Sequence, residues 1–291
     1  MKRYIMEGEN KPLVSIIIPV YNRVDLLPRT LNSVINQTYK DIEIIVVDDG
    51  STEDIKSVVD NFNDPRIKYL RHNENKGVAA ARNTGMKISR GAFIAFLDSD
   101  DEYLPEKIEK QVEFFLEQSN ETDVVYCGVW RKGEDGKLSL WTPYISNWNF
   151  LVQQIMIKRS VIERVGLFDE EFIWVEDVDY MCRLKDTCKC KGFSEPLVIY
   201  NYEGNSITNT YKLPVLKFTE LFIQKHYNRL SNKERSKWFY KLGQRYKRLH
   251  KISDAMRCFY KAYIEYPLNW KALKKLVGLS PLLLFYILKR N

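Results

Sequence analysis

Short apolar runs that end in polar clusters constrain the fold of this chain more than any other feature of its sequence. Residues 13–18, 42–47 and 92–97 are almost continuously apolar, as expected of strands buried on both faces of a sheet. Segments with helical periodicity separate them, at 26–35, 53–62, 77–89 and 105–118. Further strands are predicted at 67–70 and 123–129. This alternation predicts an α/β fold, with a mostly parallel sheet flanked by helices.

Three polar clusters follow directly on the three apolar runs. They occupy residues 19–23, 48–51 and 98–101. Ligands of open α/β sheets bind beyond the carboxyl ends of the strands. Three polar clusters at one such edge are more than hydrophobic patterning requires, so we expect the functional site there.

The cluster Asp98-Ser99-Asp100-Asp101 places three carboxylates within four residues. Their mutual repulsion costs stability unless a cation neutralises them. Carboxylate oxygens suit Mg²⁺ or Mn²⁺, which would keep open positions for diphosphate oxygens. The alternative is that an aspartate caps the helix that begins near Pro105. The cluster at 48–51 has a similar alternative, because Asp-Gly-Ser is ordinary turn chemistry.

Two further segments carry candidate charged groups. Arg82 lies in the small-residue segment 75–83 and offers a guanidinium fork for phosphate, or is an exposed arginine on a packing helix. Glu176 and Asp177 would lie at the positive end of a helix that begins at Glu176. A carboxylate there is either a general base for a hydroxyl acceptor or part of an acidic, solvated helix start.

The charge is divided unevenly along the chain. Residues 205–291 carry 19 Lys/Arg and 4 Asp/Glu, a net charge of +15. The other residues carry 26 Lys/Arg and 34 Asp/Glu, a net charge of −8. A basic tail on an acidic body indicates contact with an anionic surface, for which charge alone allows nucleic acid or anionic lipid. Nucleic acid is disfavoured as a partner, because interleaved aromatics with base-stacking motifs are absent and acidic clusters dominate the body.

The tail has helical periodicity from about residue 211 to its end. Its small and apolar residues fall at the spacings of one tetratricopeptide repeat, at Leu242, Gly243, Tyr246, Ala255, Phe259, Ala262 and Pro267. A lone repeat is not stable by itself, so this hairpin should pack on other parts of the chain. The apolar run 282–288 near lysines is expected to lie at a membrane interface, to close the core of the hairpin, or to form a homodimer contact.

Cysteine usage and the N-terminus bear on the compartment. The five cysteines are odd in number and widely spread, as in reduced cytosolic proteins. No secretory signal and no apolar stretch of spanning length is recognisable. We therefore expect a cytoplasmic protein that is soluble or peripheral at the inner face of the cell membrane.

Taken together, these motifs resemble the family 2 glycosyltransferases of the GT-A fold, from Pro12 to about Asn209. The resemblance rests on five segments in the family's order. They are the opening strand at 14–22 with its continuation at 31–39, Val46 to Thr52, Asn75 to Asn83, Phe96 to Pro105, and Gly166 to Asp177. It implies an inverting enzyme that transfers a hexose-type sugar from a nucleoside-diphosphate donor, with a UDP-sugar favoured.

The resemblance also implies roles for individual residues. The nucleobase would be held by Pro19, Tyr21 and Asp49, with Tyr21 stacking on it, Asp49 accepting from a ring N–H, and Arg23 and Asp48 assisting. Arg82 would lie near the diphosphate or the donor sugar, and Ser99 would also belong to the donor site. Asp98 would contact ribose or sugar hydroxyls, and Asp100 would ligate Mn²⁺ or Mg²⁺ directly, with Asp98 as a second ligand. Asp177 would be the catalytic base, with Glu176 as its substitute.

Three parts of the chain are expected on this basis. Residues 12–122 would form the nucleotide-sugar-binding half of the GT-A domain, 123–210 the acceptor-binding half with the base, and 211–291 the basic helical extension. The acceptor would be a hydroxyl of a cell-surface glycan or a lipid-linked oligosaccharide. Two alternatives stay open, a catalytically inactive nucleotide-sugar-binding relative and a component of a processive polysaccharide synthase.

One departure from the family concerns the diphosphate. Many relatives place a histidine in the loop that corresponds to Tyr202–Thr208, where it reaches the diphosphate. This chain has no histidine between His72 and His226. The resemblance therefore implies no histidine contact to the diphosphate from that side.

Overall fold

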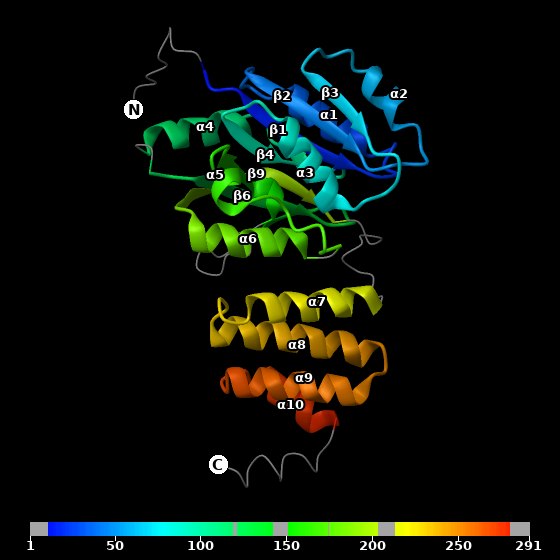
Figure 1. The fold of residues 1–291 in the computed structure, drawn as a ribbon, viewed down its shortest axis with the longest axis vertical. Coiled ribbons are helices and arrows are strands. Elements are labelled where there is room, and N and C mark those ends of the chain that lie inside the picture. The colour runs from blue at the N-terminus through cyan, green and yellow to red at the C-terminus, as the bar shows by residue number, and fades with distance from the viewer. Residues whose placement is uncertain (1–10, 119–120, 142–150, 174, 203–212, 280–291) are drawn as a thin grey trace. The chain divides into compact units, whose positions relative to one another are not determined.

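The computed structural model describes residues 11–118, 121–141, 151–173, 175–202 and 213–279. The chain divides into two compact units, Met1–Gly204 and Asn205–Asn291. The first contains the sheet and the second contains helices only among its described residues (Figure 1).

One mixed sheet forms the centre of the first unit. In the described residues its strands run in the order β3-β2-β1-β4-β8-β6-β9-β5, with β7 beside β6. Their bounds are β1 Val14–Val20, β2 Ile42–Asp48, β3 Ile67–Arg71, β4 Phe93–Phe96, β5 Glu102–Tyr103, β6 Val124–Lys132, β7 Leu138–Trp141, β8 Ile155–Lys158 and β9 Cys190–Asn201. Strands β3, β2, β1 and β4 are parallel, and so are β6 and β9. The predicted mostly parallel sheet is confirmed, with β5, β7 and β8 antiparallel to their neighbours.

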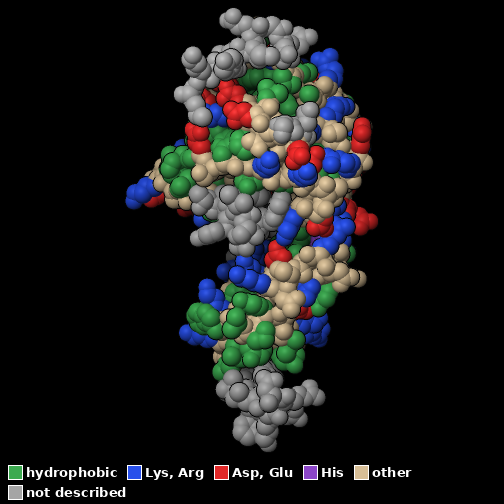
Figure 2. Space-filling model, turned by 90° about the vertical axis from the view of Figure 1, so that its left-hand side faces the viewer, with side chains coloured by type: hydrophobic (Ala, Val, Ile, Leu, Met, Phe, Trp, Pro, Cys, Tyr) green, Lys and Arg blue, Asp and Glu red, His purple; other side chains and the backbone are tan. Residues whose placement is uncertain are grey.

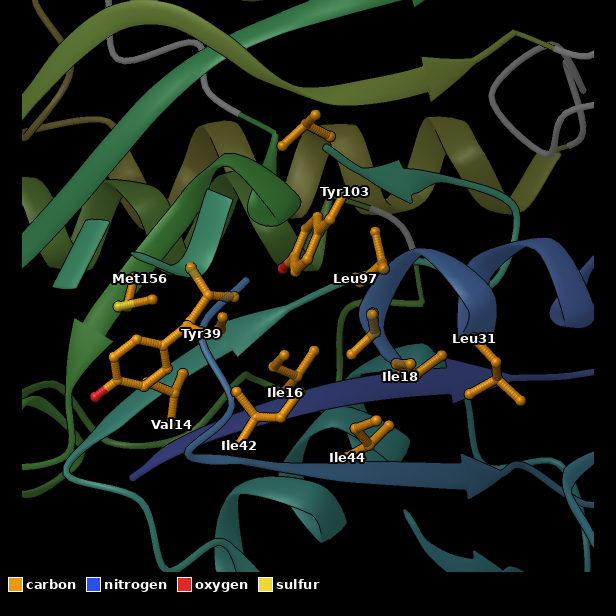
Figure 3. Packing of buried hydrophobic residues seen from close by; sticks show 14 of the residues in the cluster. Val14, Ile16, Ile18, Leu31, Tyr39, Ile42, Ile44, Leu97, Tyr103 and Met156 are labelled. Atoms are coloured by element: carbon orange, nitrogen blue, oxygen red, sulfur yellow. The ribbon is translucent and has the colours of Figure 1, made fainter. Parts of the chain in front are cut away.

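The alternation of side chains along β1 explains the two helical layers. Ile16 and Ile18 pack in one fully buried cluster with the helices of one face, which are α1 (Leu27–Ile35), α2 (Ile55–Asp60) and α4 (Lys107–Glu117). Ile17 points to the other face and packs with α3 (Val78–Ile88), α5 (Val161–Val165) and α6 (Glu176–Thr187). Figure 3 shows Ile16 and Ile18 beside Ile42 and Ile44 of β2, with Leu31 of α1 above them. Burial on both faces is what continuous apolar runs predict.

Helix α3 lies unusually close to the sheet. A Cβ atom on Gly85 would be 2.5 Å from Cγ2 of Ile17, so only glycine fits at this contact. The predicted alanine-rich helix is therefore a packing helix, but Arg82 on it is 3% exposed and not a surface arginine.

The second unit contains four described helices, α7 (Leu213–His226), α8 (Asn232–Arg248), α9 (Ile252–Glu265) and α10 (Trp270–Leu279). Ser231 caps α8 in a capping box with Glu234. Gly243 of α8 lies against Phe259 of α9, where a Cβ atom would be 2.8 Å from Cε1 of the ring. The hairpin predicted from the repeat spacing is thus formed by α8 and α9.

The expectations about membrane contact concern the apolar run near the C-terminus and the helices of the chain. The apolar run 282–288 lies outside the described residues. Within the described part of the chain, no helix is long and apolar enough to cross a membrane.

Candidate functional site

The three polar clusters lie at neighbouring strand ends. Strand β1 pairs in parallel with β2 on one side and with β4 on the other, with Val20 opposite Asp48 and Ile17 opposite Phe96. The amide of Asp49 also donates to the carbonyl of Val20, at 2.8 Å. Tyr21, Asp49 and Asp98 therefore all follow strands that leave the sheet at one edge.

The loops after β1 and β2 are joined by the side chain of Asn22. Its Oδ1 accepts from the backbone amide of Thr52 at 2.8 Å, and the backbone amide of Asn22 donates to Oγ of Ser51 at 3.0 Å. Asn22 has a φ of 50°, which asparagine tolerates better than most residues. Tyr21 stays 42% exposed beside this joint, with Pro19 buried behind it and Arg23 half-buried after it. An exposed aromatic ring on a rigid loop can stack on a planar ligand.

Asp48 is fully buried and its carboxylate is used within the fold. Oδ2 accepts from the hydroxyl of Tyr69 at 2.6 Å and Oδ1 accepts from the amide of Ser51 at 2.9 Å. Arg71 adds an ion pair to Oδ2 at 3.7 Å. These contacts make Asp48 a support of the loop, which corresponds to the turn-forming alternative for this cluster.

Asp49 fastens the loop between β3 and α3 onto the end of β2. Its Oδ1 accepts from the amide of Lys76 at 2.9 Å and lies 2.7 Å from Nδ1 of His72, while Oδ2 accepts from the amide of Gly77 at 2.8 Å. The next residue, Gly50, has a φ of 74°, and a Cβ atom there would lie 2.4 Å from the carbonyl carbon of Glu74. The glycine therefore permits the close approach of these two loops.

Arg82 lies between carboxylates from two distant segments. Its Nη2 contacts Oδ1 of Asp98 at 2.7 Å, and its Nη1 contacts Oε1 of Glu176 at 2.8 Å. Asp98 follows β4 and Glu176 begins α6, so the guanidinium connects the two halves of the sheet unit. Burial acts against the charge, yet the carboxylates raise the pKa of Arg82 and keep it protonated. Beside it, Asn83 exchanges two hydrogen bonds with the backbone of Phe168, each of 2.9 Å.

Glu176 and Asp177 occupy the first turn of α6. Burial, and then the neighbouring Asp177 carboxylate, raise the pKa of Glu176 to about 7 against the opposing effect of Arg82. Burial also raises the pKa of Asp177, while Arg82 opposes the rise. A carboxylate with a raised pKa is better suited to accept a proton near neutral pH. Val175, just before them, has a φ of 67°, which strains a β-branched residue by about 1–3 kcal/mol.

The aspartates after β4 have different surroundings. The side chain of Asp98 is 32% exposed beside Arg82, and Ser99 is buried. The carbonyl of Asp100 accepts from Arg29 at 2.7 Å and from Asn201 at 2.9 Å, which fixes the backbone of this turn.

Asp101 belongs to the interior of the fold. It is fully buried, and its carboxylate accepts from the side chain of Gln153 and from the amide of Asn201. Its hydrogen bonds, together with the ion pair of Asp98 with Arg82, offset part of the repulsion between the three carboxylates, for which we expected a cation. The metal argument therefore rests on Asp98 and Asp100 alone.

The oxygens of Asp98 and Asp100 suit a small divalent cation that is shared with a phosphate. Mg²⁺ is commonly held by one or two carboxylates together with substrate phosphates, so these two residues are a sufficient donor set. No group of three or more His, Cys, Asp or Glu side chains that could enclose a metal occurs within the described ranges. A cation held by Asp98 and Asp100 would therefore need further oxygen ligands, which a diphosphate could supply.

Three residues far away in the sequence hold this edge together, and none of them was predicted as a site residue. His72, Gln153 and Asn201 each bond to an aspartate of the clusters, over separations of 23, 52 and 100 residues. Gln153 belongs to the short 3₁₀ helix Val152–Gln154. Only His72 gave a sequence signal, since it lies two residues after the short strand predicted at 67–70.

Comparison with known proteins agrees with this geometry. The family model described as Glycosyl transferase family 2 matches residues 15–169. The chain is 36% identical over 177 residues to UDP-Glc:alpha-D-GlcNAc-diphosphoundecaprenol beta-1,3-glucosyltransferase WfaP of Escherichia coli, covering 58% of this chain and 67% of that protein. It is 32% identical over 212 residues to an uncharacterized glycosyltransferase of Haemophilus influenzae, covering 71% of this chain and 82% of that protein.

A solved structure with the same architecture is that of TarS from S. aureus. TarS 1-349 superposes with a TM-score of 0.65 at 18% identity, covering 88% of this chain and 81% of that one, and the match covers 49% of the longer TarS chain. TarS 1-349 has also been solved with UDP and with UDP-GlcNAc, with TM-scores of 0.60 and 0.61 to this chain. At this identity the likeness concerns the fold, which is GT-A with a helical extension.

Proposed function

Because the chain belongs to glycosyl transferase family 2, we propose that it is an inverting hexosyltransferase that uses a UDP-sugar. The observation that carries this proposal is the buried Arg82, which pairs with Asp98 after β4 and with Glu176, the neighbour of Asp177. Tyr21 and Asp49 follow strands that end at the same edge of the sheet as β4. The TarS complexes with UDP and UDP-GlcNAc support the donor class, because they involve the same fold.

The donor nucleotide would lie over the loops after β1 and β2. Tyr21 stacks on the pyrimidine with its exposed ring, and Pro19 and Arg23 frame that side. Asp49 accepts from the ring N–H. Asp48 assists by supporting the loop that carries Asp49, through its hydrogen bonds with Tyr69 and Ser51.

The diphosphate and sugar would extend toward the turn after β4. Asp98 receives sugar or ribose hydroxyls on the part of its carboxylate that Arg82 leaves open, with Ser99 beside it. Arg82 contributes positive charge near the diphosphate while its ion pair holds Asp98 in place. Asp100, with Asp98, would hold Mn²⁺ or Mg²⁺, which supplies positive charge for the departing nucleoside diphosphate.

Asp177 would act as the base that removes the proton of the acceptor hydroxyl. The attacking oxygen then forms a bond to the anomeric carbon while the bond to the diphosphate oxygen breaks, which inverts the configuration in one displacement. Glu176 is the weaker candidate, because its carboxylate is tied to Arg82 at 2.8 Å. Its role is to hold Arg82, and through it Asp98, in place.

The acceptor would be a lipid-linked saccharide presented at a membrane surface. The name of the E. coli relative specifies a sugar on diphosphoundecaprenol, which supports this acceptor class. In the helical unit, Ile264, Leu268 and Trp270 are 56%, 75% and 62% exposed, with the exposed lysine Lys271 next to them. Figure 2 shows apolar side chains gathered with basic ones on the visible face of this unit. Apolar and basic groups together suit an anionic lipid surface.

The donor is tested by thermal shift with a panel of nucleotide sugars in the presence of Mn²⁺. UDP-sugars should raise the melting temperature, and Asp100→Ala should abolish the part of the shift that needs the metal. No stabilisation by any UDP-sugar would contradict the proposed donor. Transfer assays with lipid-linked acceptors then separate an active enzyme from an inactive relative, which would bind the donor and leave it intact.

The membrane contact is tested by co-sedimentation with vesicles that contain phosphatidylglycerol. Leu268→Glu with Trp270→Glu should lower the bound fraction, whereas Leu116→Glu, at a 65% exposed leucine of the other unit, should not. Equal binding of both variants would count against the contact. A change from dimer to monomer in the double variant would indicate that a second copy covers these residues instead.

A further inference from the structure

His72 connects the predicted base-reading aspartate to the helix behind it. Its Nδ1 lies 2.7 Å from Oδ1 of Asp49, and its Nε2 lies 2.9 Å from Oγ1 of Thr84 on α3. The side chain of His72 is 10% exposed, and its amide donates to the carbonyl of Asp48 at 2.8 Å. Both the backbone and the ring of His72 are therefore held at the end of β3.

The direction of these hydrogen bonds follows from chemistry. An ionised carboxylate only accepts, so Nδ1 carries the proton that is donated to Asp49. In the neutral ring Nε2 then accepts from the hydroxyl of Thr84, which can donate as well as accept, so the contact with Asp49 decides the tautomer. The chain Thr84–His72–Asp49 thus delivers a donor to one particular oxygen of Asp49.

The remaining acceptor capacity of Asp49 is small. A carboxylate has about four lone-pair sites. Oδ1 uses two of them, for His72 and Lys76, and Oδ2 uses one, for Gly77. One lone pair of Oδ2 is left over from these contacts, and its direction is set because both oxygens are held.

We infer that His72 is a specificity-determining positioning residue that makes Asp49 discriminate uracil from cytosine. The inference rests on the proposed role of Asp49 in reading the nucleobase. Uracil offers N3–H to the remaining lone pair of Oδ2, whereas N3 of cytosine is itself an acceptor and would face the carboxylate with no proton between them. A carboxylate held in one orientation enforces this difference, while one that can rotate away tolerates cytosine.

The test is calorimetric binding of UDP and of CDP with Mn²⁺, and its readout is the ratio of the two dissociation constants. His72→Phe keeps the ring but removes both nitrogens, and it should lower the preference for UDP about tenfold. His72→Asn places an amide nitrogen near the position of Nδ1, so it should keep most of the preference. His72→Gln reaches the position of Nε2 instead and should behave like the phenylalanine variant.

Two controls separate the possible failures. Asp49→Asn should abolish the preference, and a wild-type protein without any preference for UDP over CDP would overturn the role of Asp49 itself. If the wild type prefers UDP and Asp49→Asn does not, but His72→Phe keeps the full ratio, the inference about His72 is wrong. A purely structural histidine would weaken UDP and CDP equally and leave the ratio unchanged, which also overturns it. Should His72→Phe fail to fold, the comparison of the asparagine and glutamine variants decides.

Discussion

Removal of Arg82 should destabilise the sheet unit more than removal of any surface cation. Its side chain is 3% exposed and its two ion pairs, to Asp98 and Glu176, have N–O distances of 2.7 and 2.8 Å. Deleting one partner of a buried pair leaves uncompensated charge and costs about 3–5 kcal/mol. With a urea m-value of about 3 kcal/mol/M, Arg82→Ala should lower the unfolding midpoint by about 1–1.7 M.

The matched control is Lys56→Ala, which deletes an equally short but exposed ion pair. Lys56 lies 2.6 Å from Asp60, with both side chains more than half exposed. Such pairs on helices are worth about 0.3–0.5 kcal/mol, so the midpoint should hardly move. Arg82→Lys keeps the charge but loses the fork, and it should fall between the two.

The loss of stability in Arg82→Ala should also depend on pH. Glu176 holds its proton up to a pH of about 7 in the folded state but releases it near 4.5 when unfolded, so stability falls as pH rises through that interval. Without Arg82 the folded pKa values of Glu176 and Asp177 rise further, and the fall becomes larger. Arg82→Ala should therefore recover stability at pH 5, measured by urea unfolding with circular dichroism. A loss below 1 kcal/mol at pH 7.5, or one that does not change with pH, would refute this reasoning.

Three further predictions concern stability and binding. Gly50 and Gly136 have nearly the same φ, 74° and 75°, but a Cβ atom would meet backbone atoms only at Gly50, at 2.4 Å. Gly50→Ala should lower the free energy of unfolding by about 2–4 kcal/mol and weaken UDP binding, whereas Gly136→Ala should lower it by about 1 kcal/mol. Urea unfolding and calorimetry measure the two effects. Burial lowers the pKa of Lys107 to about 7, so the stability of the wild type should rise as the pH is raised from about 7 toward 10.5. Lys107→Met should remove this rise and be more stable than the wild type at pH 6. An unchanged pH profile of stability in the variant would contradict this prediction. In the helical unit, Gly243→Ala meets the ring of Phe259 at 2.8 Å and should lower the melting temperature, whereas Gly278→Ala, with open space around it, should raise it slightly, and the same sign for both would count against the packing described.

The elements of the sheet unit were largely predictable, because their signals are local. The apolar runs at 13–18, 42–47 and 92–97 became β1, β2 and β4, with no end differing by more than two residues. Strand β5, of two residues, escaped prediction, since it exists only through its pairing with Val198 and Ile199 of β9. The position of β8 as an antiparallel strand between β4 and β6 could not be predicted either, because strand order is decided by contacts between distant residues.

The site was predictable in its residues but less so in their division of labour. The sequence shows five aspartates in two clusters, and apart from the family resemblance it offers no means of ranking them. Burial and long-range partners separate them: Asp48 and Asp101 support the fold, whereas Asp98 keeps a partly exposed carboxylate. The burial of Arg82 could not be foreseen either, because its carboxylate partner Glu176 lies 94 residues away.

The central claim is that Asp177 promotes a single displacement from a UDP-sugar. Its most direct test is the anomeric configuration of the product, determined by NMR after transfer from an α-linked UDP-sugar to a lipid-linked acceptor. We predict a β-linked product from the wild type, and no product from Asp177→Asn with UDP binding nearly intact. An α-linked product, or full transfer by Asp177→Asn, would contradict the account.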